Sequence, residues 1–123
     1  MNKIILTGTV LQEPFFKSYD SSSPKILCAK MQTHDSWTDK KTGDSRGRSQ
    51  WHTLVFPKRF ESTVLSYMAQ GRKLLVEGKL CYNPYMINNE KVIVAEIEVS
   101  YFEFLDDKQL TEHLSGVDDE LPI

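Results

Sequence analysis

The sequence predicts an all-β domain with one helix, and three observations carry this prediction. Apolar side chains recur at every second position along five stretches of the chain, which is the period of a half-buried strand. Residues 58–70 change instead to a period of four, which is typical of a helix. Gly, Pro, Asn and Asp separate the stretches and mark turns. At 123 residues, the chain has the length of one domain.

Three strands are expected before the helix. Residues 2–11 alternate apolar and polar side chains, and Gly8 within them indicates a bend. A second strand is expected over residues 25–37, and a third over residues 50–56. Between them, residues 38–49 hold no large apolar side chain and several Gly, Lys, Arg and Asp, so we expect an exposed loop.

The helix is expected over residues 58–70, directly after Pro57, because proline suits the start of a helix. Gly71 stands where a glycine cap would end it. The spacing of four is carried by Phe60, Val64 and Met68.

Two further strands complete the pattern. Residues 73–82 form the fourth and continue into a hairpin with Asn88 and Asn89 at its tip, and residues 91–105 form the fifth. Three strands, one helix and two strands is the order of the OB-fold, a five-stranded Greek-key barrel with its helix between strands three and four. An SH3-like barrel or a small open sheet would show much the same alternation, so the pattern alone leaves these alternatives open.

Charge is distributed unevenly along the chain. Residues 1–105 carry 14 Lys and Arg against 11 Asp and Glu, whereas residues 106–123 carry one Lys against six acids. The net charge of −2 therefore combines a mildly basic body with an acidic tail. Cys28 and Cys81 have no CxxC spacing and no secretory leader precedes Met1, which favours free thiols in a reducing cytoplasm. No apolar run approaches the roughly 20 residues that cross a bilayer.

The residues show no catalytic constellation. His34, His52 and His113 are scattered, no His/Cys cluster has zinc spacing, and no glycine-rich loop forms a phosphate cradle. Glu96 and Glu98 share a strand face as a pair of carboxylates, but a solvated face explains them better than acid–base chemistry. We therefore expect neither an enzyme nor a cofactor or metal ion.

Aromatic and basic residues gather around the second and third strands. Trp37 ends the second strand and Trp51 opens the third, and the loop between them carries Lys40, Lys41, Arg46 and Arg48. Flat rings beside mobile cations suit an unpaired nucleic-acid strand, because bases stack on rings and phosphates need positive charge. Core packing is the alternative for Trp51 and above all for Phe56, whereas Trp37 and Tyr85 flank polar loops and favour a surface position. The basic loop alone would also fit a solvated hairpin tip.

The last six residues form an acidic and apolar segment, which suits a peptide ligand. Its apolar end would enter a small pocket while its carboxylates meet a basic rim. A solvated acidic terminus is the alternative. The segment consists of Asp118, Asp119, Glu120, Leu121, Pro122 and Ile123.

Several segments together resemble bacterial single-stranded DNA-binding proteins. They are NKIIL (2–6) with Gly8, QEP (12–14), SWTDKKTG (36–43), WHTLVF (51–56), LVEGKL (75–80) and the ending DDELPI (118–123). The match spans about residues 2–105 and the last six, and the joint spacing is specific although each motif alone is weak.

The resemblance implies an OB-fold domain over residues 1–105, a short linker over residues 106–117 and a partner-binding tip over residues 118–123. It further implies a cytoplasmic, nucleoid-associated homotetramer that binds single-stranded DNA without sequence preference in replication, recombination and repair. In this interpretation the tip recruits replication and repair proteins. Subunit contacts are expected at Lys3, Ile5 and His52. DNA contacts are expected at Trp37, Lys40, Lys41, Arg46, Arg48, Trp51, Phe56, Arg59, Arg72, Lys73, Lys79 and Tyr85.

The chain also departs from the family. Tyr85 stands where a third tryptophan is common, and Pro57 stands at a stacking phenylalanine, with Phe56 one residue earlier and so directed to the other face. Usual basic residues are replaced by Cys81, Asn83 and Pro84, although Tyr82 could add a ring. Ile123 replaces a usual Phe, and the linker is short. The alternative function is a primosomal-type OB module that bridges replication proteins and binds DNA only secondarily.

Overall fold

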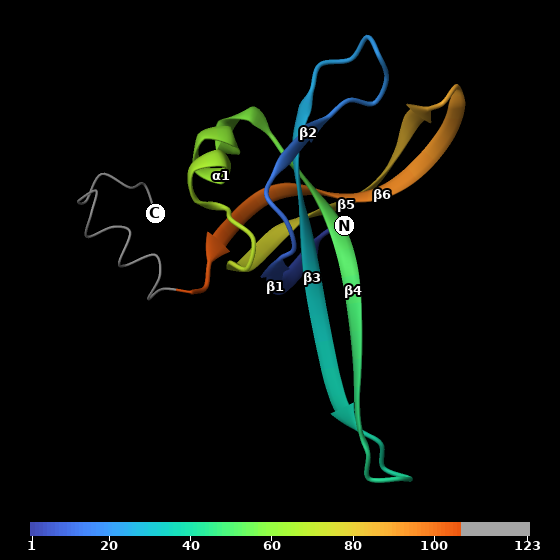
Figure 1. Ribbon diagram of the computed structural model, residues 1–123, viewed down its shortest axis with the longest axis vertical. Helices are drawn as coiled ribbons and strands as arrows, with labels where there is room; N and C mark the ends of the chain where they lie inside the picture. The colour runs from blue at the N-terminus through green and yellow to red at the C-terminus, as the bar shows by residue number, and fades with distance from the viewer. Residues whose placement is uncertain (107–123) are drawn as a thin grey trace, which may run out of the picture.

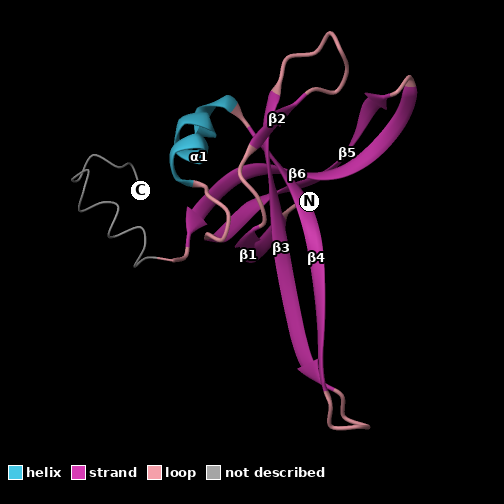
Figure 2. Ribbon diagram, viewed as in Figure 1, coloured by secondary structure: helices cyan, strands magenta, loops and turns pink. Residues whose placement is uncertain are grey.

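The structure is a computed structural model that describes residues 1–106, and strands account for most of them (Figures 1 and 2). A single short helix follows the fourth strand. The elements are β1 (Ile4–Val10), β2 (Phe15–Lys17), β3 (Ile26–Thr38), β4 (Ser45–Phe56), the 3-10 turn η1 (Lys58–Phe60), α1 (Glu61–Tyr67), β5 (Lys73–Ile87) and β6 (Glu90–Phe104).

Five strands close into a barrel. The sheet runs in the order β1-β5-β6-β4-β3-β2, and an additional pairing of β1 with β3 joins its two sides. All the pairings are antiparallel except the short contact between β4 and β6, where Leu54 is opposite Ile97. The barrel strands are β1, β3, β4, β5 and β6, and the one helix lies between β4 and β5. This arrangement confirms the OB-fold and rules out the SH3-like barrel and the small open sheet. The short strand β2, which pairs with the outer edge of β3, was not expected from the sequence.

Gly8 permits the closure of the barrel. Along β1 it is opposite Leu74 of β5, and the next residue, Thr9, pairs with both Lys73 of β5 and Gln32 of β3. A Cβ atom at Gly8 would lie 2.1 Å from the carbonyl oxygen of Gln32, which no side chain can tolerate. The expected glycine bend is therefore confirmed, and its cause is the close approach of two backbones.

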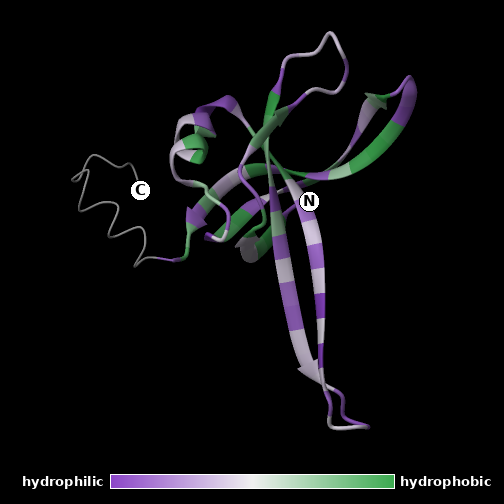
Figure 3. Cartoon of the chain, in the orientation of Figure 1, coloured by the Kyte–Doolittle hydropathy of each residue, from purple (hydrophilic) through white to green (hydrophobic). Residues whose placement is uncertain are grey.

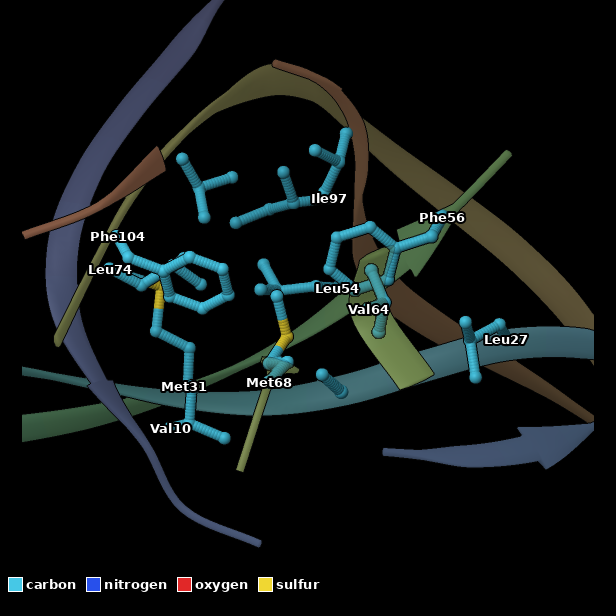
Figure 4. Packing of buried hydrophobic residues seen from close by; sticks show 13 residues of the cluster. Val10, Leu27, Met31, Leu54, Phe56, Val64, Met68, Leu74, Ile97 and Phe104 are labelled. Carbon is cyan, nitrogen blue, oxygen red and sulfur yellow. The ribbon is translucent and has the colours of Figure 1, made fainter. Parts of the chain in front are cut away.

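The core fills the barrel from inward-facing positions on alternate strand residues (Figure 4). Leu27, Ala29 and Met31 contribute from β3, and Leu54 and Phe56 contribute from the neighbouring β4. All five are almost fully buried. The members of this cluster alternate along each strand, as the apolar residues predicted, although Cys28 and Val55 between them are also buried.

The helix covers one end of the barrel with Val64, and Met68 follows directly after it into the core. It is shorter than the expected residues 58–70, because η1 occupies the first turn and α1 ends at Tyr67. Gly71 has a φ of +93°, as glycine allows, but it lies in the turn that leads to β5 and not at the helix end.

Half of the expected loop over residues 38–49 is strand. β4 begins at Ser45, so only residues 39–44 connect it to β3. The Asp39 amide donates to the Asp44 carbonyl at 2.8 Å, and Gly43 turns the chain with a φ of +77°. The backbone ladder thus continues although its side chains are polar. The sequence missed this because the two strands project from the barrel and bury neither face.

The β5–β6 hairpin ends as expected. Asn88 and Asn89 have φ angles of 52° and 65°, the left-handed pair that a two-residue turn of type I′ requires. The register is regular from Ile87 opposite Glu90 down to Gly78 opposite Val99. Side chains of this hairpin therefore alternate strictly between two faces.

Candidate nucleic-acid interface

The outer parts of β3 and β4 form a free-standing two-stranded ribbon, here called the β3–β4 ribbon (residues 33–38 and 45–50). It projects away from the barrel in Figure 1, and Figure 3 shows that it is mostly hydrophilic. Trp37 lies near its far end, opposite Arg46, and 49% of the residue is exposed. A half-exposed indole on a polar ribbon packs against no core, so its ring is open to a ligand.

Trp51 lies at the base of the ribbon and is 74% exposed. The register pairs it with Gln32, which places it on the opposite face of the two strands from Trp37. Arg46, the partner of Trp37, is five positions from Trp51, or roughly 17 Å along β4. The sequence predicted a surface position for Trp37 and left core packing open for Trp51, which the structure rules out. The pairing adds that a polymer touching both rings must pass from one face to the other.

Acidic residues partly neutralise the cations of the ribbon. Asp39 accepts a hydrogen bond from the Arg46 guanidinium at 3.2 Å, and Asp35 is opposite Arg48 across the strands. Lys40 and Lys41 are exposed in the loop at the tip. The ribbon therefore has exposed aromatic rings but only a small net positive charge.

The other expected cations lie apart from the ribbon. Arg59 and Lys79 line one open groove with Lys3, and this groove also contains Glu77 and Glu98. Lys73 lies at the start of β5, where its ammonium donates to the Thr9 hydroxyl at 3.3 Å. The structure thus does not bring all the predicted basic residues into one site.

Arg72 requires a correction, because its guanidinium is buried. It donates to Asp106 at 2.9 Å and to the Tyr67 carbonyl at 2.8 Å, and it lies 4.0 Å from the centre of the Phe104 ring. Burial opposes ionisation of Asp106, but hydrogen bonds from Arg72 and the Lys73 amide prevail and lower the pKa of that carboxyl. Arg72 therefore fastens the end of β6 and cannot reach a phosphate.

Phe56 also requires a correction, since it belongs to the core. Only 2% of it is exposed, and its ring packs edge-on against Phe102 with 5.5 Å between centroids. Trp51 and Phe56 are five positions apart on β4, so alternation directs them to opposite faces. Core packing, the alternative considered for Phe56, is what the structure shows.

Tyr85 is buried, so the expectation of a surface position is wrong. It is 4% exposed, its ring centroid lies 4.7 Å from that of Tyr19, and the Lys17 ammonium lies 4.3 Å from its centre. The Tyr85 hydroxyl donates to Glu96 at 2.6 Å. β2 and the residues after it thus cover the ring that the sequence assigned to DNA. Alternation along β5 gave no sign of this, because the covering residues come from a distant segment.

Glu96 is the centre of a buried polar network and not part of a solvated face. It is 1% exposed. It accepts hydrogen bonds from the Tyr85 hydroxyl and from the Asn83 side-chain amide, both at 2.6 Å, and it forms an ion pair with the Lys17 ammonium at 2.8 Å. Burial alone would raise its pKa, but these three partners outweigh burial and lower it. Burial and the Glu96 charge together raise the pKa of Tyr85. The network ties β2 to the β5–β6 hairpin.

Comparison with known proteins shows the family to which the chain belongs. A model of the single-strand binding protein family matches residues 1–105. The chain belongs to this family. The single-stranded DNA-binding protein of Rickettsia typhi is 29% identical over 122 residues, covering 94% of this chain and 80% of that protein. That of Rhizobium meliloti is 33% identical over 81 residues, covering 65% of this chain and 46% of that protein.

Solved structures agree with this relationship. The complex of the Plasmodium falciparum SSB with single-stranded DNA has a TM-score of 0.69 and 28% identity, covering 86% of this chain and 96% of that chain. A small single-stranded DNA-binding protein from Streptomyces coelicolor has a TM-score of 0.62 at 14% identity, covers 86% of this chain and 95% of that one, and shares the fold alone. Proteins of this family bind DNA and are not enzymes.

Of the expected subunit-contact residues, Lys3 directly precedes β1 and Ile5 lies on it, whereas His52 lies on β4 and lines the same groove as Ile5. The Lys3 ammonium forms an ion pair with the Glu77 carboxylate of β5, and Ile5 is 60% exposed. His52 is half-buried beside the Thr33 hydroxyl at 2.9 Å, and burial lowers its pKa. Within residues 1–106, the Ile4–Gly8 part of β1 pairs with β5 on one side and with no strand on the other.

Among residues 1–106 there is no group of three His, Cys, Asp or Glu placed to hold a metal ion, and no helix there is long and apolar enough to span a membrane. Cys28 and Cys81 are both free. Burial raises the pKa of the Cys28 thiol to about 11, so it is an unreactive core residue.

The Glu96 network predicts acid sensitivity. Because the pKa of Glu96 is lower in the folded protein than in the unfolded chain, the unfolded chain takes up the proton first as pH falls. The free energy of unfolding should therefore decline from about pH 5 downwards. Glu96→Gln should cost about 3 kcal/mol at pH 7, because it leaves Lys17 without its partner, and should flatten the decline. Urea unfolding at several pH values measures both.

Glu98→Gln is the matched control. This carboxylate is two positions along β6, is 55% exposed and lies 3.9 Å from Lys79, so its removal should change stability by less than about 1 kcal/mol. An unchanged pH profile in Glu96→Gln would show that the network is not the source of the acid sensitivity.

Proposed function

We propose that this chain binds single-stranded DNA without sequence preference and protects it in replication, recombination and repair. The observation that carries the proposal is the pair of exposed tryptophans, Trp37 and Trp51, on a ribbon that projects from an OB barrel. Neither ring belongs to the hydrophobic core and about half or more of each residue is exposed, whereas any base can stack on such rings. The relatives' names and the Plasmodium falciparum complex with single-stranded DNA support it. The place of action would be the cytoplasmic nucleoid.

Binding should depend on stacking more than on charge. Residues 1–105 have a balance of only +3, and two ribbon cations already face carboxylates. Each stacked base contributes roughly 1–3 kcal/mol, whereas each phosphate contact changes the salt slope by only about −0.7 on single strands. Exposed rings are thus the main source of affinity at moderate salt.

Trp37→Ala should therefore weaken binding to poly(dT) more than Lys41→Ala at moderate salt. We expect a loss of about tenfold for the tryptophan and a smaller, salt-dependent loss for the lysine. Fluorescence anisotropy of a labelled oligonucleotide measures both, with Thr38→Ala, an exposed neighbour on the other face, as the control. Equal losses would show that charge dominates. No loss in either variant would favour the primosomal-type interaction module.

We further propose that the chain assembles as a homotetramer through β1 and the surroundings of His52. The open edge of β1 supports this, because unpaired strand edges pair readily with another chain, and the exposed Ile5 would otherwise stay in water. Light scattering across a tenfold dilution should keep a mass near four chains. A monomer at micromolar concentration would contradict the assembly without affecting the DNA-binding proposal.

The third part of the proposal concerns residues 118–123, which lie outside the described residues, as does the linker after Asp106. We propose that this acidic and apolar segment recruits replication and repair proteins through basic-rimmed pockets. Asp106, the first linker residue, is held by Arg72 at the end of the barrel. Because only about a dozen residues separate it from the segment, the segment should also compete with DNA for the protein's own cations.

Deletion of residues 118–123 should tighten DNA binding at low salt, and the gain should fade as salt screens the charges. The same deletion should abolish capture of partner proteins. Anisotropy titrations at two salt concentrations and a pull-down with a purified partner helicase or exonuclease measure the two effects. Identical DNA binding together with unchanged capture would mean that the segment is merely a solvated terminus.

A further inference from the structure

The two faces of the β3–β4 ribbon differ in charge. Paired side chains share a face, so the face of Trp37 also carries Asp35, Arg46 and Arg48. Within residues 33–38 and 45–50, His34 is the only titratable side chain on the other face, which is the face of Trp51. The remaining ribbon residues of that face are Ser36, Thr38, Ser45, Gly47 and Ser49. A phosphate on the Trp51 face therefore meets His34 or a cation from a neighbouring strand.

The Trp51 face continues from the ribbon onto the outside of the barrel. Trp51 pairs with Gln32 of β3. Thr9 of β1 pairs with Gln32 on one side and with Lys73 of β5 on the other. The four residues thus form one row, which lies on the outer surface because the next residues of β1, β3 and β5 belong to the core. From Trp51 to Lys73 the row covers three strand spacings, about 14 Å.

A groove of about 490 Å³ lies along this row, beside the short contact between β1 and β3. Ligand sites commonly have volumes of about 300–1,000 Å³. Lys73 and His34 line the groove from its two sides, and Gln32, Thr7 and Thr9 add neutral polar groups. None of the described residues that line it is an Asp or a Glu. The groove therefore suits a single anionic group.

The His34 ring is positioned by β4. Its Nδ1 atom lies 2.8 Å from the Ser49 hydroxyl, which can donate to the neutral ring or accept from the charged one. A Cβ atom at Gly47 would lie 3.0 Å from the Cε1 atom of the ring, so the missing side chain there gives the ring its space. When the ring is doubly protonated, Nδ1 donates to Ser49 and Nε2 can donate to an anion. The ring can therefore gain charge without losing its contact with β4.

Lys73 is the only charged side chain among the residues that line the groove with His34. Its ammonium donates to the Thr9 hydroxyl and forms no ion pair within residues 1–106. Two acids belong to the same end of the barrel. Asp106 is bound by the Arg72 guanidinium, and Glu103 accepts a hydrogen bond from the Tyr101 hydroxyl. Neither acid lines the groove, so an added anion would not have to displace a carboxylate.

We propose that this groove binds one backbone phosphate of the single strand that stacks on Trp51, and that His34 makes the contact dependent on pH. The inference rests on the proposed function and adds a phosphate subsite to it. Histidine side chains in general gain their positive charge between pH 8 and pH 5, so lowering the pH adds a second cation beside Lys73. A phosphate in the groove then accepts a charge-assisted hydrogen bond from each.

The test measures binding of labelled (dT)35 to the full chain at pH 8 and pH 6, each over a series of salt concentrations. The unmodified protein should bind about three- to tenfold more tightly at pH 6 and low salt, and its salt slope should steepen by about 0.7, the share of one phosphate. His34→Gln should bind like the unmodified protein at pH 8 and should not bind more tightly at pH 6. His34→Lys, which is charged at both pH values, should bind tightly at both.

Two controls isolate the groove. His113→Gln changes a histidine outside the described residues and should keep the full effect of pH. A (dT)35 probe with methylphosphonate linkages has no backbone charge, so its binding should be the same at pH 6 and pH 8. Thermal unfolding at both pH values shows whether each variant is folded.

An effect of pH that persists in His34→Gln would assign it to another group and overturn the inference. An effect that persists with the methylphosphonate probe would also overturn it, because the contact would then not be to a phosphate. If the unmodified protein binds (dT)35 equally at both pH values, only this inference fails. If it binds (dT)35 at neither, the proposed function itself fails.

Discussion

The closure of the barrel between β1 and β3 determines where the rest of the structure lies. Gly8 lets the two backbones meet, yet the direct pairing is confined to Thr9 and Val10. Beyond that contact β3 has only β4 as a partner, so both strands leave the barrel as a ribbon. The ribbon has no core to cover and so holds its tryptophan rings in water. The position of the ribbon and of its tryptophans therefore depends on the close backbone contact that Gly8 allows.

A buried ion pair determines which side of the second hairpin is available. Burying Glu96 is costly unless its charge is matched, and Lys17, Tyr85 and Asn83 match it together. These contacts hold β2 and Tyr19 against one face and leave the opposite face open. The contacts that stabilise the hairpin therefore also determine which of its two faces is exposed.

Much of the fold could be predicted from the sequence. In a closed barrel, side chains point alternately into the core and outwards, so apolar residues recur at every second position of a strand. The glycine bend at Gly8 and the turn at Asn88–Asn89 followed from backbone chemistry. The surface position of Trp37 followed from its polar neighbours, whereas the sequence left core packing open for Trp51. The ribbon was mistaken for a loop because neither of its faces is buried, so its side chains show no alternation. Arg72 and Tyr85 were misplaced for another reason. Their partners, Asp106 and the β2 segment, are far away in sequence and meet them only in the folded chain.

The central claim is that both tryptophan rings, on opposite faces of the ribbon, stack on the same DNA. Because Trp37 and Trp51 are the only tryptophans, two variants, Trp37→Phe and Trp51→Phe, each isolate the fluorescence of one ring. The measurement is the change in that fluorescence as poly(dT) is added. Stacking on both rings predicts quenching in both variants, saturating at the same ratio of nucleotides to protein. Emission that stays constant in either variant, while anisotropy shows DNA to be bound, would contradict the claim for the ring that the variant retains.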